Sequence, residues 1–214
     1  MNISSNFGIA YTSLEDFPWS LLPNNFKNDN VIAKRQVYLT QILKRWLFIN
    51  IFKVNPDVIH LQNEFLGKPY IDDVINSWHF NFSDCGQWLA IIWGKHPVGI
   101  DILTHDIHFD GDEPASHIAM KEAYSKMLGI GLNFNWEDIQ CVKNCNDTYS
   151  IYWRNKLAQG VQLSFKGFKE ILIAFTAQNS SEALFSVKSE SFIIHLQNFN
   201  WENAFKKNPK LIGV

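Results

Sequence analysis

The run Val98-Gly99-Ile100-Asp101-Ile102-Leu103 places one carboxylate in a segment whose other residues are apolar or glycine. Such a run predicts a buried strand, where an unpaired carboxylate is costly. Asp101 must therefore be hydrogen-bonded, lie near a cation or stand at an exposed edge of the strand. Taken alone, a structural aspartate bonded to a nearby backbone turn is the simpler interpretation.

The composition limits the class of protein. The chain has 214 residues, 46% apolar and 19% charged, which is typical of a soluble globular protein with one large domain or two small ones. Its 19 basic and 21 acidic residues nearly cancel, so we expect neither nucleic acid nor a membrane surface as a partner. We expect no signal peptide and no membrane span. Three cysteines form no disulfide framework and favour a cytoplasmic location.

Apolar periodicity predicts an α+β fold of two similar halves, each a long helix packed on a small, mainly antiparallel sheet. Helices are expected over 31–50 and over 115–128, the second of which follows Pro114 and precedes Gly129. Strands are expected near 7–12, 77–82, 88–93, 98–103, 149–153, 161–165, 171–176, 183–188 and 191–196.

Two further clusters each have a simple and a functional interpretation. Glu122 and Lys126 are four residues apart in the second predicted helix, so they share one face. The simple interpretation is a surface ion pair worth about 0.3–0.5 kcal/mol, and the functional one is a metal-binding or basic carboxylate beside a phosphate-binding ammonium. The segment 105–113 begins like a calcium loop at Asp106, but its twelfth position is His117 rather than glutamate, so we expect a solvated loop.

Four motifs occur in order between residues 67 and 126. They are Gly67-Lys68-Pro69, His79-Phe80-Asn81-Phe82-Ser83, Val98-Gly99-Ile100-Asp101-Ile102 and Lys121-Glu122-Ala123-x-x-Lys126. In this order they resemble the motifs of the 4′-phosphopantetheinyl transferases, in the long, monomeric, surfactin-synthetase-activating form. Outside these residues the resemblance is one of architecture.

The resemblance implies a pseudo-twofold pair of halves with the active site between them. Residues 1–97 would form the N-terminal half, and residues 98–214 the C-terminal half with the metal-binding motifs. The implied reaction transfers 4′-phosphopantetheine from coenzyme A to a serine of an acyl or peptidyl carrier protein, with Mg²⁺ as cofactor. Coenzyme A and the carrier protein are the implied partners, and the implied state is a monomer.

The resemblance also assigns roles to residues by position. Asp101 and Glu122 would hold Mg²⁺ on the coenzyme A pyrophosphate. Glu122 would also take the serine proton or orient the base that does, and Lys126 would neutralise charge on the leaving 3′,5′-ADP. Further residues would bind phosphates or frame the adenine pocket, namely Arg35, Lys68 with Pro69, Ser83 and Asp84.

The chain departs from the family pattern in three places. Asp84 replaces the histidine that follows the motif's serine, and Leu103 replaces the second acid of the strand motif. The segment 102–121 is shorter than in such enzymes, and Ile118 stands where the helix motif has an aromatic residue. These departures support an alternative, a degenerate member that binds a carrier protein or coenzyme A without catalysis.

Overall fold

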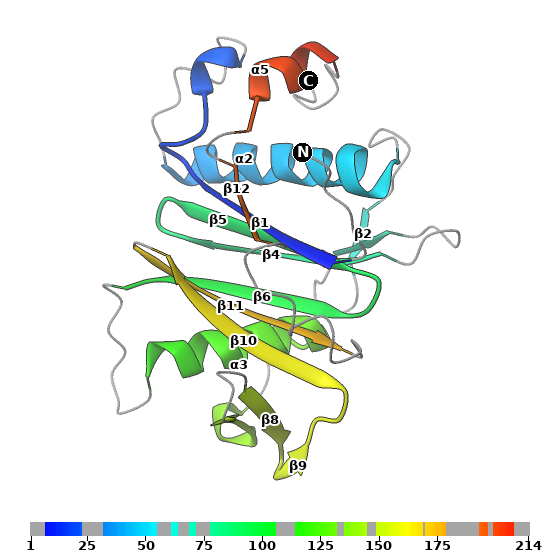
Figure 1. The fold of residues 1–214 in the computed structure, drawn as a ribbon, viewed down its shortest axis with the longest axis vertical. Coiled ribbons are helices and arrows are strands. Elements are labelled where there is room, and N and C mark those ends of the chain that lie inside the picture. Colours follow the sequence, from blue (N-terminus) through cyan, green and yellow to red (C-terminus); the bar gives the residue numbers. More distant parts are fainter. Residues whose placement is uncertain are drawn as a thin grey trace.

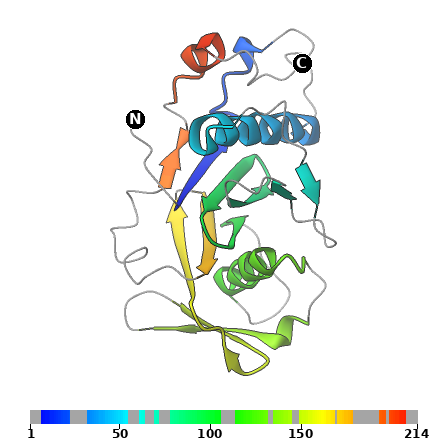
Figure 2. The same ribbon diagram turned by 90° about the vertical axis from the view of Figure 1, so that its right-hand side faces the viewer.

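The computed structural model describes residues 7–22, 32–54, 61–63, 69–71, 78–105, 114–131, 135–144, 149–168, 170–178, 193–196 and 199–207. In this part of the chain the layers run helix, sheet, sheet, helix (Figures 1 and 2). The α+β class expected from the sequence is confirmed.

The first half consists of helix α2 (Ile32–Leu47) on a sheet with strand order β12-β1-β5-β4. The strands are β1 (Phe7–Ser13), β4 (His79–Cys85), β5 (Trp88–Gly94) and β12 (Ile193–His195). Their pairs are antiparallel apart from the parallel pair of β1 with β12. Helix α2 passes into a π-helical turn, η2 (Phe48–Phe52), which agrees with the helix predicted over 31–50.

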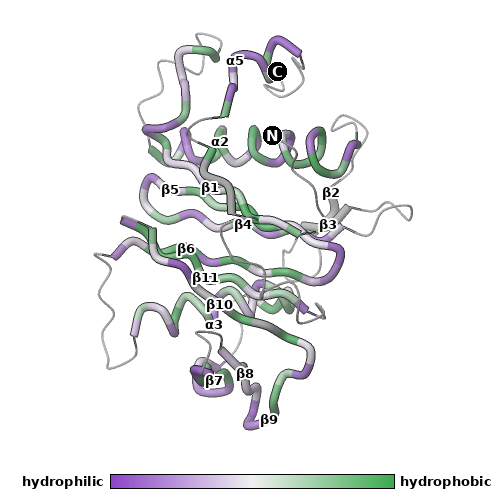
Figure 3. Tube along the Cα trace, in the orientation of Figure 1, coloured by the Kyte–Doolittle hydropathy of each residue, from purple (hydrophilic) through white to green (hydrophobic). Residues whose placement is uncertain are grey.

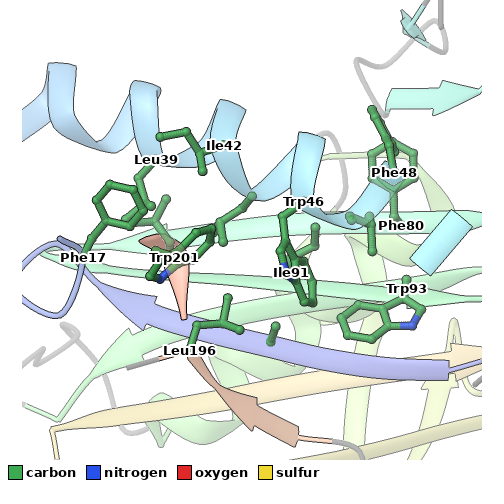
Figure 4. Packing of buried hydrophobic residues seen from close by; sticks show 14 of the residues in the cluster. Phe17, Leu39, Ile42, Trp46, Phe48, Phe80, Ile91, Trp93, Leu196 and Trp201 are labelled. Carbon is green, nitrogen blue, oxygen red and sulfur yellow. The ribbon is translucent and has the colours of Figure 1, made fainter. Parts of the chain in front are cut away.

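Large apolar side chains fill the space between α2 and this sheet (Figure 4). Trp46 of α2 meets Trp93 of β5 edge to face, with 5.9 Å between ring centroids. The polar and apolar residues of α2 alternate in Figure 3, as expected for a helix with one buried face. Leu196 and Trp201, the first residue of α5 (Trp201–Lys207), join the same core. The division between residues 97 and 98 stays a prediction, but residues near the C-terminus pack with the first half.

Strand β4 is longer than the strand expected over 77–82. It continues to Cys85, because Asp84 pairs with Leu89 and Cys85 pairs with Trp88. The turn is therefore Gly86 and the residue after it, and Gly86 has φ +58, a value that favours glycine. Strand β4 therefore includes residues 83–85, which the predicted strand left out.

The second half consists of helix α3 (Ala115–Leu128) on a sheet with strand order β6-β11-β10-β8-β7, with β9 paired to β8. Its strands are β6 (Val98–Thr104), β7 (Ile139–Lys143), β8 (Tyr149–Trp153), β9 (Lys156–Leu157), β10 (Val161–Phe168) and β11 (Ile171–Gln178). As predicted, α3 follows Pro114 and precedes Gly129, whose φ is 72. A twofold relation between the halves stays a prediction.

Shorter elements complete the described part of the chain. They are η1 (Trp19–Leu21), η3 (Trp136–Asp138) and the antiparallel pair β2 (Leu61–Asn63) and β3 (Pro69–Ile71). The strand predicted at 183–188 and most of the predicted loop at 105–113 lie outside the described residues.

Both faces of β6 are buried, each against a different layer. Val98, Ile100 and Ile102 pack between the two sheets. The alternate residues of the strand face α3, so Asp101 and Leu103 share the helix side of β6.

Gly99 determines how closely α3 approaches β6. A Cβ at this position would lie 2.6 Å from the backbone nitrogen of Met127 and far inside van der Waals contact with the carbonyl oxygen of Ala123. Glycine is therefore needed for this spacing. Because Glu122 and Lys126 lie on the adjacent part of α3, the close approach brings them near Asp101.

Candidate active site

Asp101 lies where β4, β6 and α3 meet, and its side chain is only 4% exposed. Its Oδ1 atom accepts hydrogen bonds from Ser83 Oγ at 2.8 Å and from Lys126 Nζ at 2.6 Å. Lys126 Nζ also donates to Ser83 Oγ at 2.9 Å. The hydrogen-bond donors to this carboxylate are side chains of β4 and α3, so the interpretation of Asp101 as an aspartate bonded to a nearby backbone turn is wrong.

The second carboxylate oxygen of Asp101 indicates a site for a donor or a cation. Oδ2 is buried and has no hydrogen-bond donor among the described residues. A buried acceptor in this state costs free energy, which a donor or cation would recover. The carboxyl of Glu122 is near enough to form a hydrogen bond with Asp101 when it carries a proton.

Burial raises the pKa of Glu122 to about 7, and the negative charge of Asp101 raises it as well. The positive charge of Lys126 lowers that pKa, and the hydrogen bond with Asp101 raises it further. The Glu122 carboxyl is therefore partly protonated near neutral pH. A carboxyl with a pKa in this range is suited to taking or giving a proton during a reaction.

We expect the metal-free protein to lose stability as the pH rises from about 4.5 through about 7. The pKa of Glu122 is higher in the folded chain than its ordinary value of 4.5, so the folded chain binds more protons across this range. Glu122→Gln keeps a neutral group beside Asp101 and should remove this part of the pH dependence. Melting temperatures of the parent protein and of Glu122→Gln, measured in a chelating buffer across this pH range, check the expectation. If the melting temperatures of both proteins change with pH in the same way, the expectation is wrong.

Leu103 stands where the family's strand motif has its second acidic residue. Its side chain is buried in the core between α3 and the second sheet. Among the described residues, no group of three His, Cys, Asp or Glu side chains is placed to hold a metal ion. Asp101 and Glu122 remain, and one or two carboxylates are enough for Mg²⁺ when phosphates and waters complete its ligands. The pair therefore fits a magnesium ion that binds together with a phosphate group.

The other residues predicted for the site are placed as follows. Arg35 lies over the ring of Trp19, with its guanidinium carbon 5.0 Å from the ring centroid. Asp84 is exposed on β4, next in sequence to the buried Ser83. Pro69 is the first residue of β3, and Lys68 lies outside the described residues. Contacts of these residues with phosphates or adenine stay predictions.

Comparisons with known proteins point to one class, the 4′-phosphopantetheinyl transferases, and confirm the resemblance inferred from the motifs. The chain is 37% identical over 151 residues to 4′-phosphopantetheinyl transferase gsp of Aneurinibacillus migulanus, a match that covers 59% of this chain and 62% of that protein. It is 29% identical over 127 residues to 4′-phosphopantetheinyl transferase psf-1 of Bacillus pumilus, covering 49% and 54%. The chain thus spans little more than half of the length of these relatives. No family model matches it.

The helices in the described ranges are too short or too polar to cross a membrane.

Proposed function

We propose that this protein transfers 4′-phosphopantetheine from coenzyme A to a serine of an acyl or peptidyl carrier protein, with Mg²⁺ as cofactor. The observation that carries the proposal is the cluster of Asp101, Glu122, Lys126 and Ser83, which three separate elements bring together. The similarity to two transferases of this name supports it. A pseudo-twofold pair of halves, a monomeric state and a cytoplasmic location belong to the same proposal.

The two carboxylates would bind the ion. Asp101 and Glu122 would hold Mg²⁺ together with phosphate oxygens of coenzyme A and water. When bound, the ion neutralises charge on the pyrophosphate. The buried Oδ2 of Asp101 supports this role, because it makes no hydrogen bond within the described residues.

The remaining steps depend on Glu122 and Lys126. The serine oxygen forms a bond to the phosphorus that carries pantetheine, and the bond between that phosphorus and the leaving 3′,5′-ADP breaks. Glu122 would take the serine proton or orient the base that does, because its carboxyl lies beside Asp101 at the site. Lys126, whose side chain is 27% exposed, would neutralise charge on the leaving group.

The test is direct. The protein is incubated with coenzyme A, Mg²⁺ and a panel of apo carrier proteins, and the carriers are then weighed by mass spectrometry. We expect one carrier or more to gain the mass of phosphopantetheine, and we expect no gain when a chelator removes Mg²⁺. A full panel without any gain would contradict the proposal.

A second candidate function is supported by two residues. Leu103 is packed into the core at the position of the second acidic residue of the family's strand motif. Asp84 replaces the histidine that follows the serine in the family. A non-catalytic protein that binds coenzyme A or a carrier protein would need neither group. Calorimetry that shows coenzyme A binding, together with no transfer to any carrier, would favour this candidate.

Leu103→Glu separates the two candidates. We expect it to cost about 2–3 kcal/mol of stability, because it places a carboxylate in the core beside α3. In an enzyme it should also lower the Mg²⁺ concentration for half-maximal transfer, because residues 101 and 103 lie on the same face of β6. Leu103→Gln is the control, with a similar loss of melting temperature and an unchanged Mg²⁺ requirement. If Leu103→Glu and Leu103→Gln have equal Mg²⁺ requirements, position 103 does not reach the ion.

A further inference from the structure

The hydroxyl of Ser83 has its whole hydrogen-bonding capacity in use within the protein. Ser83 Oγ accepts from Lys126 Nζ at 2.9 Å and from the backbone nitrogen of Ile102 at 3.3 Å. It donates its single proton to Asp101 Oδ1 at 2.8 Å. A serine hydroxyl has one proton and two lone pairs, so no donor remains for a phosphate oxygen.

We propose that Ser83 is a positioning residue, which acts on the reaction through Asp101 and Lys126 and not through contact with a phosphate of coenzyme A. The inference rests on the proposed function and revises the role that the family resemblance implies for this serine.

Ser83 connects the two halves of the molecule at the site. It belongs to β4, at the edge of the first sheet, whereas its partners belong to β6 and α3 of the second half. The bond from the Ile102 nitrogen fixes Oγ relative to the backbone of β6, and Ser83 is buried. The hydroxyl therefore has a defined position from which it holds one oxygen of Asp101.

The two oxygens of Asp101 then have different functions. Ser83 and Lys126 occupy Oδ1, whereas Oδ2 has no donor among the described residues. Without the hydroxyl, Lys126 alone would hold Oδ1, and the carboxylate could rotate about its Cβ–Cγ bond. Because a cation needs Oδ2 together with Glu122, this rotation should weaken cation binding. Groups that orient metal ligands in this way typically change metal affinity by about 10- to 100-fold.

The test uses Mn²⁺ as a probe, followed by its electron paramagnetic resonance signal at high protein concentration without any phosphate. We expect Ser83→Ala to weaken Mn²⁺ binding by about 10-fold and Ser83→Thr, which keeps a hydroxyl, to restore most of it. Ser125→Ala is the matched control, because this buried hydroxyl on α3 donates only to the backbone oxygen of Glu122, at 2.9 Å. Its Mn²⁺ affinity should equal that of the parent, and melting temperatures show that each variant is folded.

A second titration distinguishes positioning from phosphate binding. Coenzyme A is titrated into each protein in a chelating buffer, where the cation contributes nothing. Positioning predicts equal coenzyme A affinity for the parent and Ser83→Ala, whereas a phosphate-binding serine predicts a loss. The inference is overturned by that loss, by unchanged Mn²⁺ affinity in Ser83→Ala, or by a parent protein that binds no Mn²⁺.

The transfer assay distinguishes a failure of this inference from a failure of the proposed function. An active parent protein whose Mn²⁺ affinity is insensitive to Ser83→Ala would refute positioning alone. An inactive parent with a Mn²⁺ site that depends on Ser83 would refute the transfer reaction alone.

Discussion

Gly99→Ala is expected to destabilise the protein by about 3 kcal/mol or more. The added Cβ would meet backbone atoms of Ala123 and Met127. Backbone atoms inside a helix cannot turn aside as the end of a flexible side chain can, so α3 would have to move away from β6. This movement would also separate Glu122 and Lys126 from Asp101. Urea unfolding measures the loss of stability, and we expect Mn²⁺ binding to weaken in parallel.

Gly167→Ala is the control for this prediction, because it makes the same change in β10 of the same sheet. The nearest atom to a Cβ at this position is Cε1 of His105, at 3.8 Å, which is an ordinary contact. Its stability should lie within about 0.5 kcal/mol of the parent. The role of Gly99 would be contradicted if both variants lost the same free energy of unfolding, or if neither did.

Asp101→Ala should weaken Mg²⁺-dependent binding of coenzyme A by about 100-fold or more. The change removes the carboxylate oxygen that would hold the ion and the shared partner of Ser83 and Lys126. The fold should survive, because Lys126 is partly exposed and its ammonium can turn to water. Glu122→Ala should have a similar effect on binding. Calorimetric titration with and without Mg²⁺ measures both.

Asp138→Ala provides a matched control for the loss of a carboxylate. Asp138 pairs with Arg154 at 3.0 Å, an ion pair in which the arginine is largely exposed. Its removal should leave coenzyme A binding and its Mg²⁺ dependence as they are in the parent. If binding stays Mg²⁺-dependent in both Asp101→Ala and Glu122→Ala, the assignment of the metal site is wrong.

The sequence predicted the long elements well, because their apolar residues repeat with a clear period. Helices α2 and α3 lie close to the predicted ranges, and β6 lies where its apolar run begins and ends. Alternation along β6 also puts Asp101 and Leu103 on one face of the strand. Four motifs in order were enough to name the residues that meet at Asp101, but not which atom contacts which.

The contacts of Asp101 depend on tertiary packing that local periodicity does not contain. Helical spacing puts Glu122 and Lys126 on one face of α3, but the spacing of α3 from β6 depends on the contact between Gly99 and Ala123. A glycine inside an apolar strand often marks the close approach of another backbone, and that signal was present at Gly99. The contribution of β4 through Ser83 had no comparable local signal, because it joins strands of different sheets.

The parallel pair of β1 with β12 also determines when the first half can finish folding. Ile9 pairs with Ile193, so the first sheet takes its last strand from a segment that is synthesised long after β1, β4 and β5. A growing chain therefore carries the edge of β1 uncovered while the whole second half is made, and such edges favour aggregation. The pairing also has a long loop to close, which slows folding. Emergence of β12 and α5 from the ribosome, more than the folding of either half, should set the moment at which α2 obtains its complete core.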